Sequence, residues 1–176
     1  MTETEKELSE TIAGRVLTWA GERRILQYGS KAGQCLKLVS ELGELGAAVL
    51  LQDEDEACDA IGDVTVCVTV LGAMFGFSLS GLIAGVIDGK KQFHPWTCYA
   101  PAHYNILGLV QSVGELADAV AQEKTESIRE RLEDILGGLM SLAPKLSLEW
   151  IRCFMSAWEE IKDRTGRMNA AGVWVS

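Results

Sequence analysis

Four acidic residues stand where the apolar pattern of two neighbouring helices calls for hydrophobic side chains. They are Glu41, Glu44, Asp59 and Asp63. Glu41 lies between Leu38 and Leu45 on an apolar stripe with helical spacing, and Glu44 follows one turn later, which predicts that both carboxylates project from adjacent parts of one face. Asp59 and Asp63 are four residues apart in the next helical run. Buried acids cost several kcal/mol unless they are paired or bind a cation, so the pattern indicates a divalent-metal site.

The residue types around these acids favour one kind of metal chemistry. Glu and Asp offer only oxygen ligands, which suit Mg²⁺ or Mn²⁺ better than zinc or copper. His94 and His103 lack the Glu-x-x-His partners of a ferritin-like di-iron bundle, and they have no Ser/His/Asp context. Magnesium held by carboxylates usually meets a phosphate substrate, although the sequence has no Walker-type loop and no GxGxxG.

The elements that carry these residues are predicted to be helices throughout. Apolar periodicity and capping residues predict helices over 11–28, 30–51, 54–75, 78–88, 102–122, 125–142 and 147–163. Residues 1–10 are expected to be frayed, and the tail after 163 is expected to be a turn with an extended end. Asp53, Glu54 and Asp55 suit a helix N-terminus. The predicted fold is all-α, a bundle of about six to seven helices.

Composition limits the classes of protein to which the chain can belong. A length of 176 residues with 48% hydrophobic content suits a single domain with a sizeable core. A net charge of −9 argues against nucleic-acid and anionic-membrane partners. The five cysteines form no CxxC, the acidic N-terminus is unlike a signal peptide, and the apolar run 64–77 is about half the length of a membrane span. The expected location is therefore the cytoplasm, with reduced thiols.

An internal repeat is visible when the chain is shifted by 71 residues. KLVSELGELGAAV then lies over GLVQSVGELADAV, and eight of the 27 positions in 37–63 are identical to those in 108–134. Glu44 and Asp63 match Glu115 and Asp134, whereas Ser112 replaces Glu41 and Glu130 replaces Asp59. Two amphipathic helices produce part of such a match by chance, so duplication and coincidence stay open. Ordinary i,i+4 charge pairs favour a packing role for the second half over a complete second site.

The motif around the four acids resembles that of a known family. Glu41-Leu-Gly-Glu44, followed by Gly62-Asp63-Val64 on the next helix, is similar to the ExxE and ExxD motifs of the MazG-like all-α nucleoside triphosphate pyrophosphohydrolases, which include dimeric dUTPases and dCTP pyrophosphatases. The resemblance covers 14–91, and the ending IKDRTGRMNAAGVWV extends it into 145–175. The ExxD glutamate falls on Ala60, so Asp59 is the substitute ligand. Glu56 is either an outer ligand or a solvated residue.

The resemblance implies an activity and a set of site residues. Glu41, Glu44, Asp59 and Asp63 would bind Mg²⁺, or Mn²⁺, on the triphosphate, and a metal-activated water positioned by Glu44 would attack the α-phosphorus. The products would be a nucleoside monophosphate and pyrophosphate. Lys37 meets either a carboxylate or a phosphate, and Trp19 either stacks on the base or packs in the core. The remaining candidates for phosphate contacts, which are otherwise plain partners of helix dipoles, are Lys90, Lys91, Arg164 and Arg167.

The same resemblance implies an intrachain pseudo-dimer. The intact half would be 14–91, the linker 92–101, the degenerate half 102–168 and the tail 169–176, all within one domain. The chain would act as a monomeric pseudo-dimer or as a homodimer. Two other functions stay open: a non-catalytic bundle that binds nucleotide or protein, which Ala60 makes plausible, and a purely structural helical protein.

Overall fold

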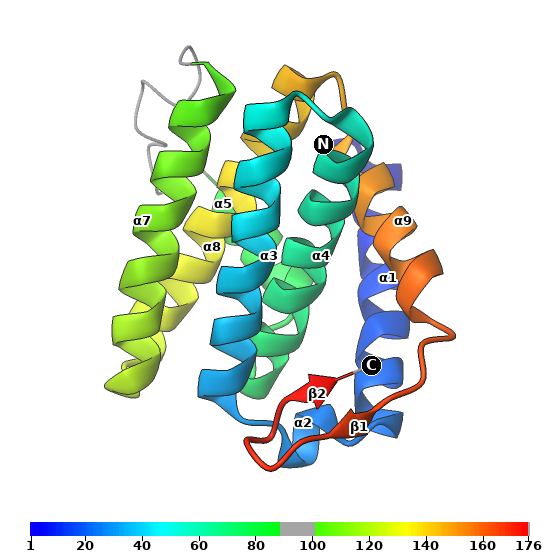
Figure 1. Cartoon of the computed structure of the whole chain (residues 1–176), viewed down its shortest axis with the longest axis vertical. Helices are drawn as coiled ribbons and strands as arrows, with labels where there is room; N and C mark the ends of the chain where they lie inside the picture. The colour runs from blue at the N-terminus through cyan, green and yellow to red at the C-terminus, as the bar shows by residue number, and fades with distance from the viewer. Residues whose placement is uncertain (89–100, 176) are drawn as a thin grey trace.

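Eight α-helices and a short hairpin account for most of the chain in the computed structural model, which describes residues 1–88 and 101–175 (Figure 1). The helices are α1 (Glu3–Glu22), α2 (Ile25–Tyr28), α3 (Lys31–Leu51), α4 (Glu54–Met74), α5 (Leu79–Ile87), α7 (Ala102–Ala121), α8 (Thr125–Leu142) and α9 (Trp150–Ile161). A 3₁₀ turn, η1 (Ala143–Leu146), joins α8 to α9, and strands β1 (Arg167–Met168) and β2 (Trp174–Val175) pair antiparallel. The all-α prediction is confirmed.

The first helix differs from the prediction at both ends. Residues 1–10 are not frayed, because Thr2 and Glu5 form a capping box in which each side chain accepts a hydrogen bond from the other's backbone N–H. The helix predicted over 11–28 is broken, because Arg24 adopts a left-handed conformation with φ of 59°. This break divides one predicted helix into α1 and α2. The described residues therefore form eight α-helices, one more than the upper value of the six to seven that the sequence predicts.

Three helices begin where the sequence places a capping residue. Ser30 Oγ accepts from the backbone N–H of Gly33 at 3.1 Å at the start of α3. Asp53 Oδ1 accepts at 3.2 Å at the start of α4, and Ser78 Oγ accepts at 3.1 Å at the start of α5. The Asp53 cap lies in the short acidic turn between α3 and α4, the two helices that carry the predicted site acids.

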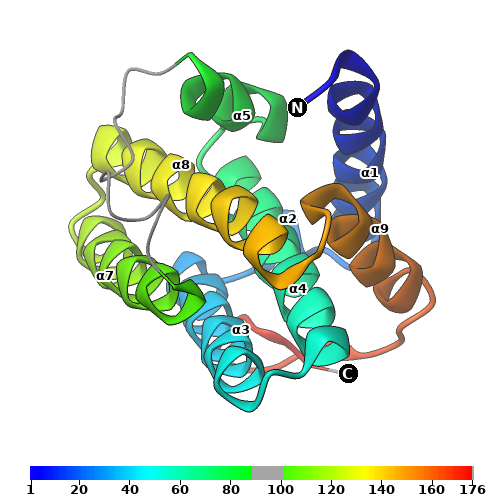
Figure 2. The same cartoon turned by 90° about the horizontal axis from the view of Figure 1, so that it is seen from above.

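Helix α4 is the centre of the bundle. Helices α3, α7 and α8 group with α4 on one side, whereas α1 and α9 pack against it on the other (Figure 2). Within the described residues, α4 is also the one helix with the length and composition of a membrane span, and 72% of that apolar window is buried inside the fold. The apolar character of α4 therefore matches its position as the core helix.

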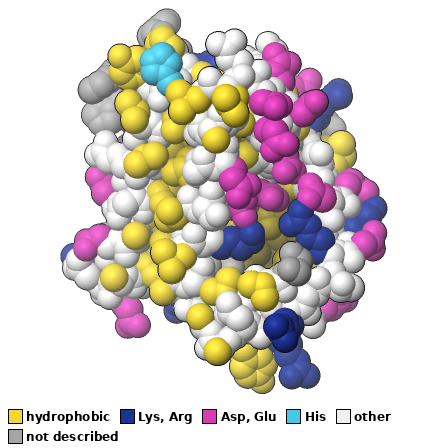
Figure 3. Space-filling view, viewed as in Figure 1, with side chains coloured by type: hydrophobic (Ala, Val, Ile, Leu, Met, Phe, Trp, Pro, Cys, Tyr) yellow, Lys and Arg dark blue, Asp and Glu magenta, His cyan; other side chains and the backbone are white. Residues whose placement is uncertain are grey.

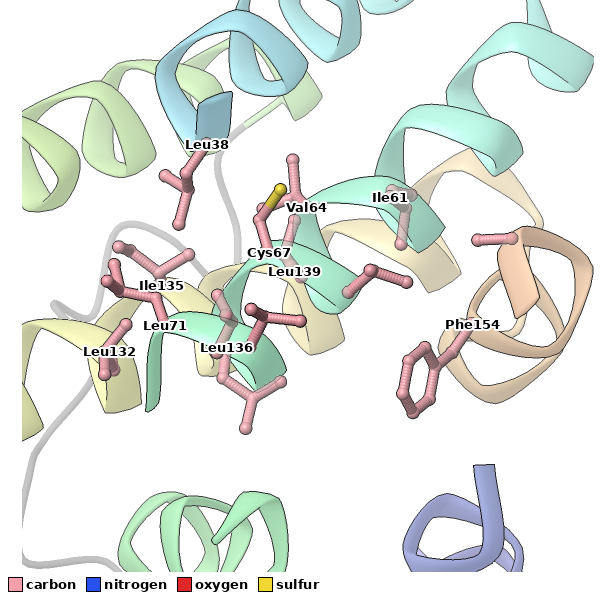
Figure 4. Packing of buried hydrophobic residues seen from close by; sticks show 14 of the residues in the cluster. Leu38, Ile61, Val64, Cys67, Leu71, Leu132, Ile135, Leu136, Leu139 and Phe154 are labelled. Atoms are coloured by element: carbon pink, nitrogen blue, oxygen red, sulfur yellow. The ribbon is translucent and has the colours of Figure 1, made fainter. Parts of the chain in front are cut away.

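The core forms where α4 meets the helices around it. Side chains of α4 such as Ile61, Val64 and Leu71 lie among apolar side chains from α3, α8 and α9 (Figure 4). Leu38 and Leu45 of α3 are fully buried, so the apolar stripe predicted around Glu41 is confirmed. A contiguous core of this kind fixes the relative positions of the helices that carry the acids.

The two halves of the sequence repeat lie side by side. Helix α3 packs against α7, α4 packs against α8, and α7 packs against α8. Residues 108–134 are therefore neighbours of 37–63, as an intrachain pseudo-dimer requires, while the pseudo-dimer itself stays a prediction. Of the predicted linker 92–101, only Pro101 belongs to the described residues.

Candidate active site

A pocket of about 300 Å³ opens between α1, α3, α4, the end of α9 and the hairpin. Its polar lining comes from Gln34, Lys37, Asp63 and Arg164, and its aromatic lining is the pair of indoles Trp19 and Trp174. On the molecular surface, a hollow with hydrophobic atoms on its floor has basic side chains beside it and a band of acidic side chains above it (Figure 3). Pockets of this size that combine apolar walls with a few polar groups bind small molecules.

Of the four predicted acids, Asp63 lines this pocket, and Glu41 and Asp59 act electrostatically on it. Glu41 is 5% exposed, and its carboxylate accepts a hydrogen bond from the Lys37 ammonium. Burial, together with the nearby charges of Glu41 and Asp59, raises the pKa of Asp63 to about 6, although Lys37 and Arg164 act in the opposite direction. Three of the four predicted acids therefore interact electrostatically, and their mutual repulsion is only partly offset by the two cations.

Lys37 is the cation in closest contact with these acids. Burial lowers the pKa of its ammonium, but the acidic groups of Cys67, Glu41 and Asp63 outweigh burial, so the pKa lies above its ordinary value. Lys37 therefore stays charged at neutral pH. Of the two partners expected for Lys37, the structure provides the carboxylate.

The other predicted acids lie at the solvent side. Glu44 is exposed whereas Glu41 is buried, so the two carboxylates, one turn apart on α3, differ in their access to solvent. Asp59 is half-buried, and Glu56 is exposed in the first turn of α4. No group of three or more His, Cys, Asp or Glu residues within 1–88 and 101–175 is arranged to hold a metal ion.

The chemistry of the donor set nevertheless fits a hard divalent cation. Carboxylate oxygens are the ligands that Mg²⁺ takes in proteins. Burial first, and then the charges of Glu41 and Asp59, raise the pKa of Asp63, and the positive charges of Lys37 and Arg164 do not offset them. In this structure Glu41 is bonded to Lys37 and Glu44 is exposed to solvent, which explains why the four acids are not gathered around one point.

The aromatic wall of the pocket joins the first helix to the tail of the chain. Trp19 and Trp174 meet edge to face, with ring centroids 6.5 Å apart and an interplanar angle of 73°. The Arg23 guanidinium lies 4.8 Å from the Trp19 ring centroid and donates to the backbone carbonyl of Arg164 at 2.7 Å. Arg23 thereby holds α1, the end of α9 and the hairpin together around the pocket.

Sequence reasoning missed Trp174. It lies in a Gly-containing tail, and β2 carries it to the pocket beside Trp19. The Asn169 side chain accepts hydrogen bonds from the backbone N–H groups of Ala171 and Val173, and Gly172 has φ of +70°. These contacts form the tight turn that returns the chain to the pocket. The only available signal was the turn chemistry of this segment.

Of the basic residues other than Lys37 predicted to contact phosphates, the structure places one in the pocket. Arg164 lines the pocket and pairs with Glu160, whereas Arg167 is exposed on β1 and is not part of the pocket lining. Lys90 and Lys91 lie outside the described residues. Asp88, which is close before them in sequence, lines a separate cavity with Lys6 and Ser9.

The raised pKa of Asp63 leads to a prediction about stability. Between pH 4 and 6 the native state retains a proton that the unfolded chain has lost, so the free energy of unfolding falls as the pH rises through this range. Asp63→Asn should remove this fall and stabilise the metal-free protein at pH 7 by about 2–3 kcal/mol. Urea unfolding in EDTA at each pH unit from 4 to 7 measures both effects. Asp55→Asn, at an exposed position, is the control, and a wild-type pH profile identical to that of Asp63→Asn would contradict the assignment.

The pocket therefore offers three chemical functions in one place: aromatic rings, positive charges and crowded carboxylates. A planar ring matches the aromatic side chains and phosphates match the positive charges, whereas the carboxylates would need a cation between them and the phosphates. Comparisons of the chain with models of protein families, with curated proteins and with solved structures find no match.

Proposed function

We propose that the chain is a Mg²⁺-dependent nucleoside triphosphate pyrophosphohydrolase of the MazG-like kind. It would convert a ribo- or deoxyribonucleoside triphosphate and water into the monophosphate and pyrophosphate, in the cytoplasm. One observation carries the proposal: Trp19, Lys37 and Asp63 line the same pocket, although they come from three different helices. A base, a phosphate and a cation each need one of these three side chains.

The base and sugar would occupy the aromatic end of the pocket. Trp19 and Trp174 provide an apolar wall, and the Gln34 amide beside them can donate and accept hydrogen bonds. Stacking of a base on an aromatic side chain is worth about 1–3 kcal/mol. The wall thus supplies affinity for any base, with Gln34 as the polar group that reads its edge.

The phosphates would meet Lys37 and Arg164. Both cations line the pocket, and both act electrostatically on Asp63. A triphosphate that takes the Lys37 ammonium releases Glu41 from its ion pair and frees that carboxylate to turn toward a cation. Substrate binding and assembly of the acidic site would then be one coupled step, which accounts for the arrangement of the acids without ligand.

The carboxylates Glu41, Asp59 and Asp63, with Glu44 at the edge, would hold Mg²⁺ or, in its place, Mn²⁺. When bound, the cation neutralises phosphate charge and makes water a stronger nucleophile. Glu44 orients the attacking water and accepts its proton. The water oxygen bonds to the α-phosphorus, the bond from the α-phosphorus to the bridging oxygen breaks, and pyrophosphate leaves with that oxygen.

A pyrophosphate-release screen tests the proposal. Purified full-length chain is incubated with each ribo- and deoxyribonucleoside triphosphate in Mg²⁺, with EDTA as the control. We expect equimolar monophosphate and pyrophosphate from at least one nucleotide, and no release in EDTA. Absence of pyrophosphate from every nucleotide would contradict the enzyme proposal.

A second candidate is a nucleotide-binding bundle without catalysis. The Lys37–Glu41 ion pair and the absence of a gathered metal-binding group within 1–88 and 101–175 favour it. This candidate predicts that nucleotides raise the melting temperature by mass action while no pyrophosphate is released. Thermal shift and turnover measured on the same sample therefore separate the two functions.

Trp174 provides a direct test of the aromatic wall. Trp174→Ala should raise KM about 10-fold with a smaller effect on kcat, because loss of a stacking surface weakens binding of substrate and transition state alike. Trp174→Phe, which retains an aromatic ring, should keep KM near the wild-type value. Steady-state kinetics on the preferred nucleotide measure both variants, and an unchanged KM for Trp174→Ala would remove Trp174 from the binding site.

A further inference from the structure

A second acidic cluster lies on the other half of the bundle, and an arginine occupies it. Arg131 Nη1 donates to Glu115 Oε2 at 2.5 Å and forms an ion pair with Asp134 Oδ2 at 3.0 Å. Arg131 Nη2 donates to Glu130 Oε2 at 3.3 Å. One guanidinium therefore bridges three carboxylates that come from α7 and α8, with a quarter of the Arg131 side chain exposed.

These three carboxylates are the repeat counterparts of predicted site acids. With the shift of 71 residues, Glu115 corresponds to Glu44, Glu130 to Asp59 and Asp134 to Asp63. Under the same shift, Arg131 corresponds to Ala60, which is buried and has no group that could reach a carboxylate. The two halves thus carry related acids on related helices, and they differ in the cation that the protein supplies. Arg131 bridges all three acids of the second half, whereas Lys37 of the first half bonds to Glu41, whose repeat counterpart is Ser112.

The electrostatics agree with a cation held firmly in the second half. Burial lowers the pKa of the Arg131 guanidinium, but Asp134, Glu115 and Glu130 outweigh burial and raise the pKa above its ordinary value. A hydrogen bond from Gln111 lowers the pKa of Glu115, and Arg131 lowers it further. The planar guanidinium matches several carboxylates at once and carries a permanent charge. A divalent cation would have to compete with it for the same oxygens.

We infer that Arg131 takes the place of a metal ion in the second half of the repeat, so that the first half alone is open to a divalent cation. The metal site in the first half rests on the proposed function. The role of Arg131 in the second half depends only on Arg131 and the three carboxylates that it bridges, so it can be tested separately.

The test removes Arg131 and counts bound Mn²⁺. Arg131→Met keeps the aliphatic stem and removes the charge, and Arg131→Ala is a second variant in case one of them folds poorly. We expect one more Mn²⁺ ion per chain than in the wild type, measured from the loss of the free Mn²⁺ signal in electron paramagnetic resonance. The melting temperature of the variant should also recover in millimolar Mn²⁺ but not in NaCl of equal ionic strength.

Two controls make the result specific. Arg131→Lys retains the charge and should bind no additional Mn²⁺. Arg129→Ala removes a neighbouring cation on α8 that lies over the Phe77 ring, outside the cluster, and it should leave the Mn²⁺ count unchanged. Equal Mn²⁺ counts for wild type, Arg131→Met and Arg131→Ala would overturn the inference about the second half.

The outcomes also separate this inference from the proposed function. If the wild type binds no Mn²⁺ and Arg131→Met binds one ion, the second-half inference holds and the first-half metal site fails. In an Asp63→Asn background, Arg131→Met should still gain its one ion, because the added site uses none of the first-half acids. A gain that disappears in this background would overturn the assignment of the new site to Glu115, Glu130 and Asp134.

Discussion

Asp63→Asn is expected to lower the rate of pyrophosphate release about 100-fold or more. Asp63 is the acid of the predicted set that lines the pocket, and its carboxylate interacts with Glu41, Asp59, Lys37 and Arg164. Loss of one carboxylate weakens the binding of a cation that stabilises transition-state charge by several kcal/mol. Each 1.4 kcal/mol of lost stabilisation lowers the rate tenfold. Initial rates at saturating Mg²⁺ and nucleotide measure the effect.

The same substitution should have the opposite effect on stability. Because a crowded carboxylate is removed, the metal-free Asp63→Asn protein should unfold at higher urea concentration than the wild type at pH 7, as expected from the raised pKa of Asp63. It should also lose the thermal stabilisation that Mg²⁺ confers on the wild type. A residue that serves only the fold would not combine greater stability with loss of turnover.

Asp134→Asn is the matched control. It changes the same residue type at the repeat-related position, where Arg131 provides a partner at 3.0 Å. Turnover of Asp134→Asn should stay within about twofold of the wild type, because the second half is not proposed to hold the catalytic cation. Equal losses of turnover in the two variants would contradict the assignment of the site to the first half.

Gly62→Ala is expected to destabilise the fold by about 1–3 kcal/mol, as overpacking of a close helix contact does. A Cβ atom at position 62 would lie 2.3 Å from the Cys153 carbonyl oxygen and 2.7 Å from Ala157 Cβ. The obstruction is backbone and a short side chain of α9, so the two helices must separate. Asp63 is the next residue, and the shift should also reduce Mg²⁺-induced stabilisation. Urea unfolding followed by far-UV circular dichroism measures the loss.

Gly43→Ala is the matched control for that substitution. It is the same change in the interior of α3, but a Cβ atom at position 43 would meet nothing within 4 Å. Alanine there should stabilise the protein by about 0.5–1 kcal/mol, because glycine has more backbone freedom to lose on folding. If both variants shifted the urea midpoint in the same direction, the close contact between α4 and α9 would be wrong.

The sequence predicted most of the fold because its signals are local. The stripe around Glu41 and the caps at Ser30, Asp53 and Ser78 depend on neighbours within a few residues, and the structure confirms them. The early start of α1 was also available, since Thr2-x-x-Glu5 is a capping-box pattern. The break at Arg24 was not, because an arginine adopts positive φ only when surrounding structure imposes it.

Much of the candidate site depends on contacts between distant parts of the chain. Trp174 meets Trp19 only because the hairpin returns the chain to α1, and local turn chemistry indicates the turn but not the helix to which it leads. The role of Gly62 depends on α9, about 90 residues later. The position of Arg131 was only partly predictable. The repeat aligns Arg131 with Ala60 in the sequence, but the contact of Arg131 with Glu115 depends on the packing of α7 against α8. Local periodicity therefore located the acids without determining which cation each half holds.

Hydrolysis in ¹⁸O-labelled water tests the central claim most directly. The full-length chain, Mg²⁺ and the preferred nucleoside triphosphate are incubated in labelled water, and the products are analysed by mass spectrometry. We predict pyrophosphate and a nucleoside monophosphate, with the ¹⁸O atom in the monophosphate, because water attacks the α-phosphorus. Label in the pyrophosphate, or no hydrolysis of any nucleotide in Mg²⁺, would contradict the account.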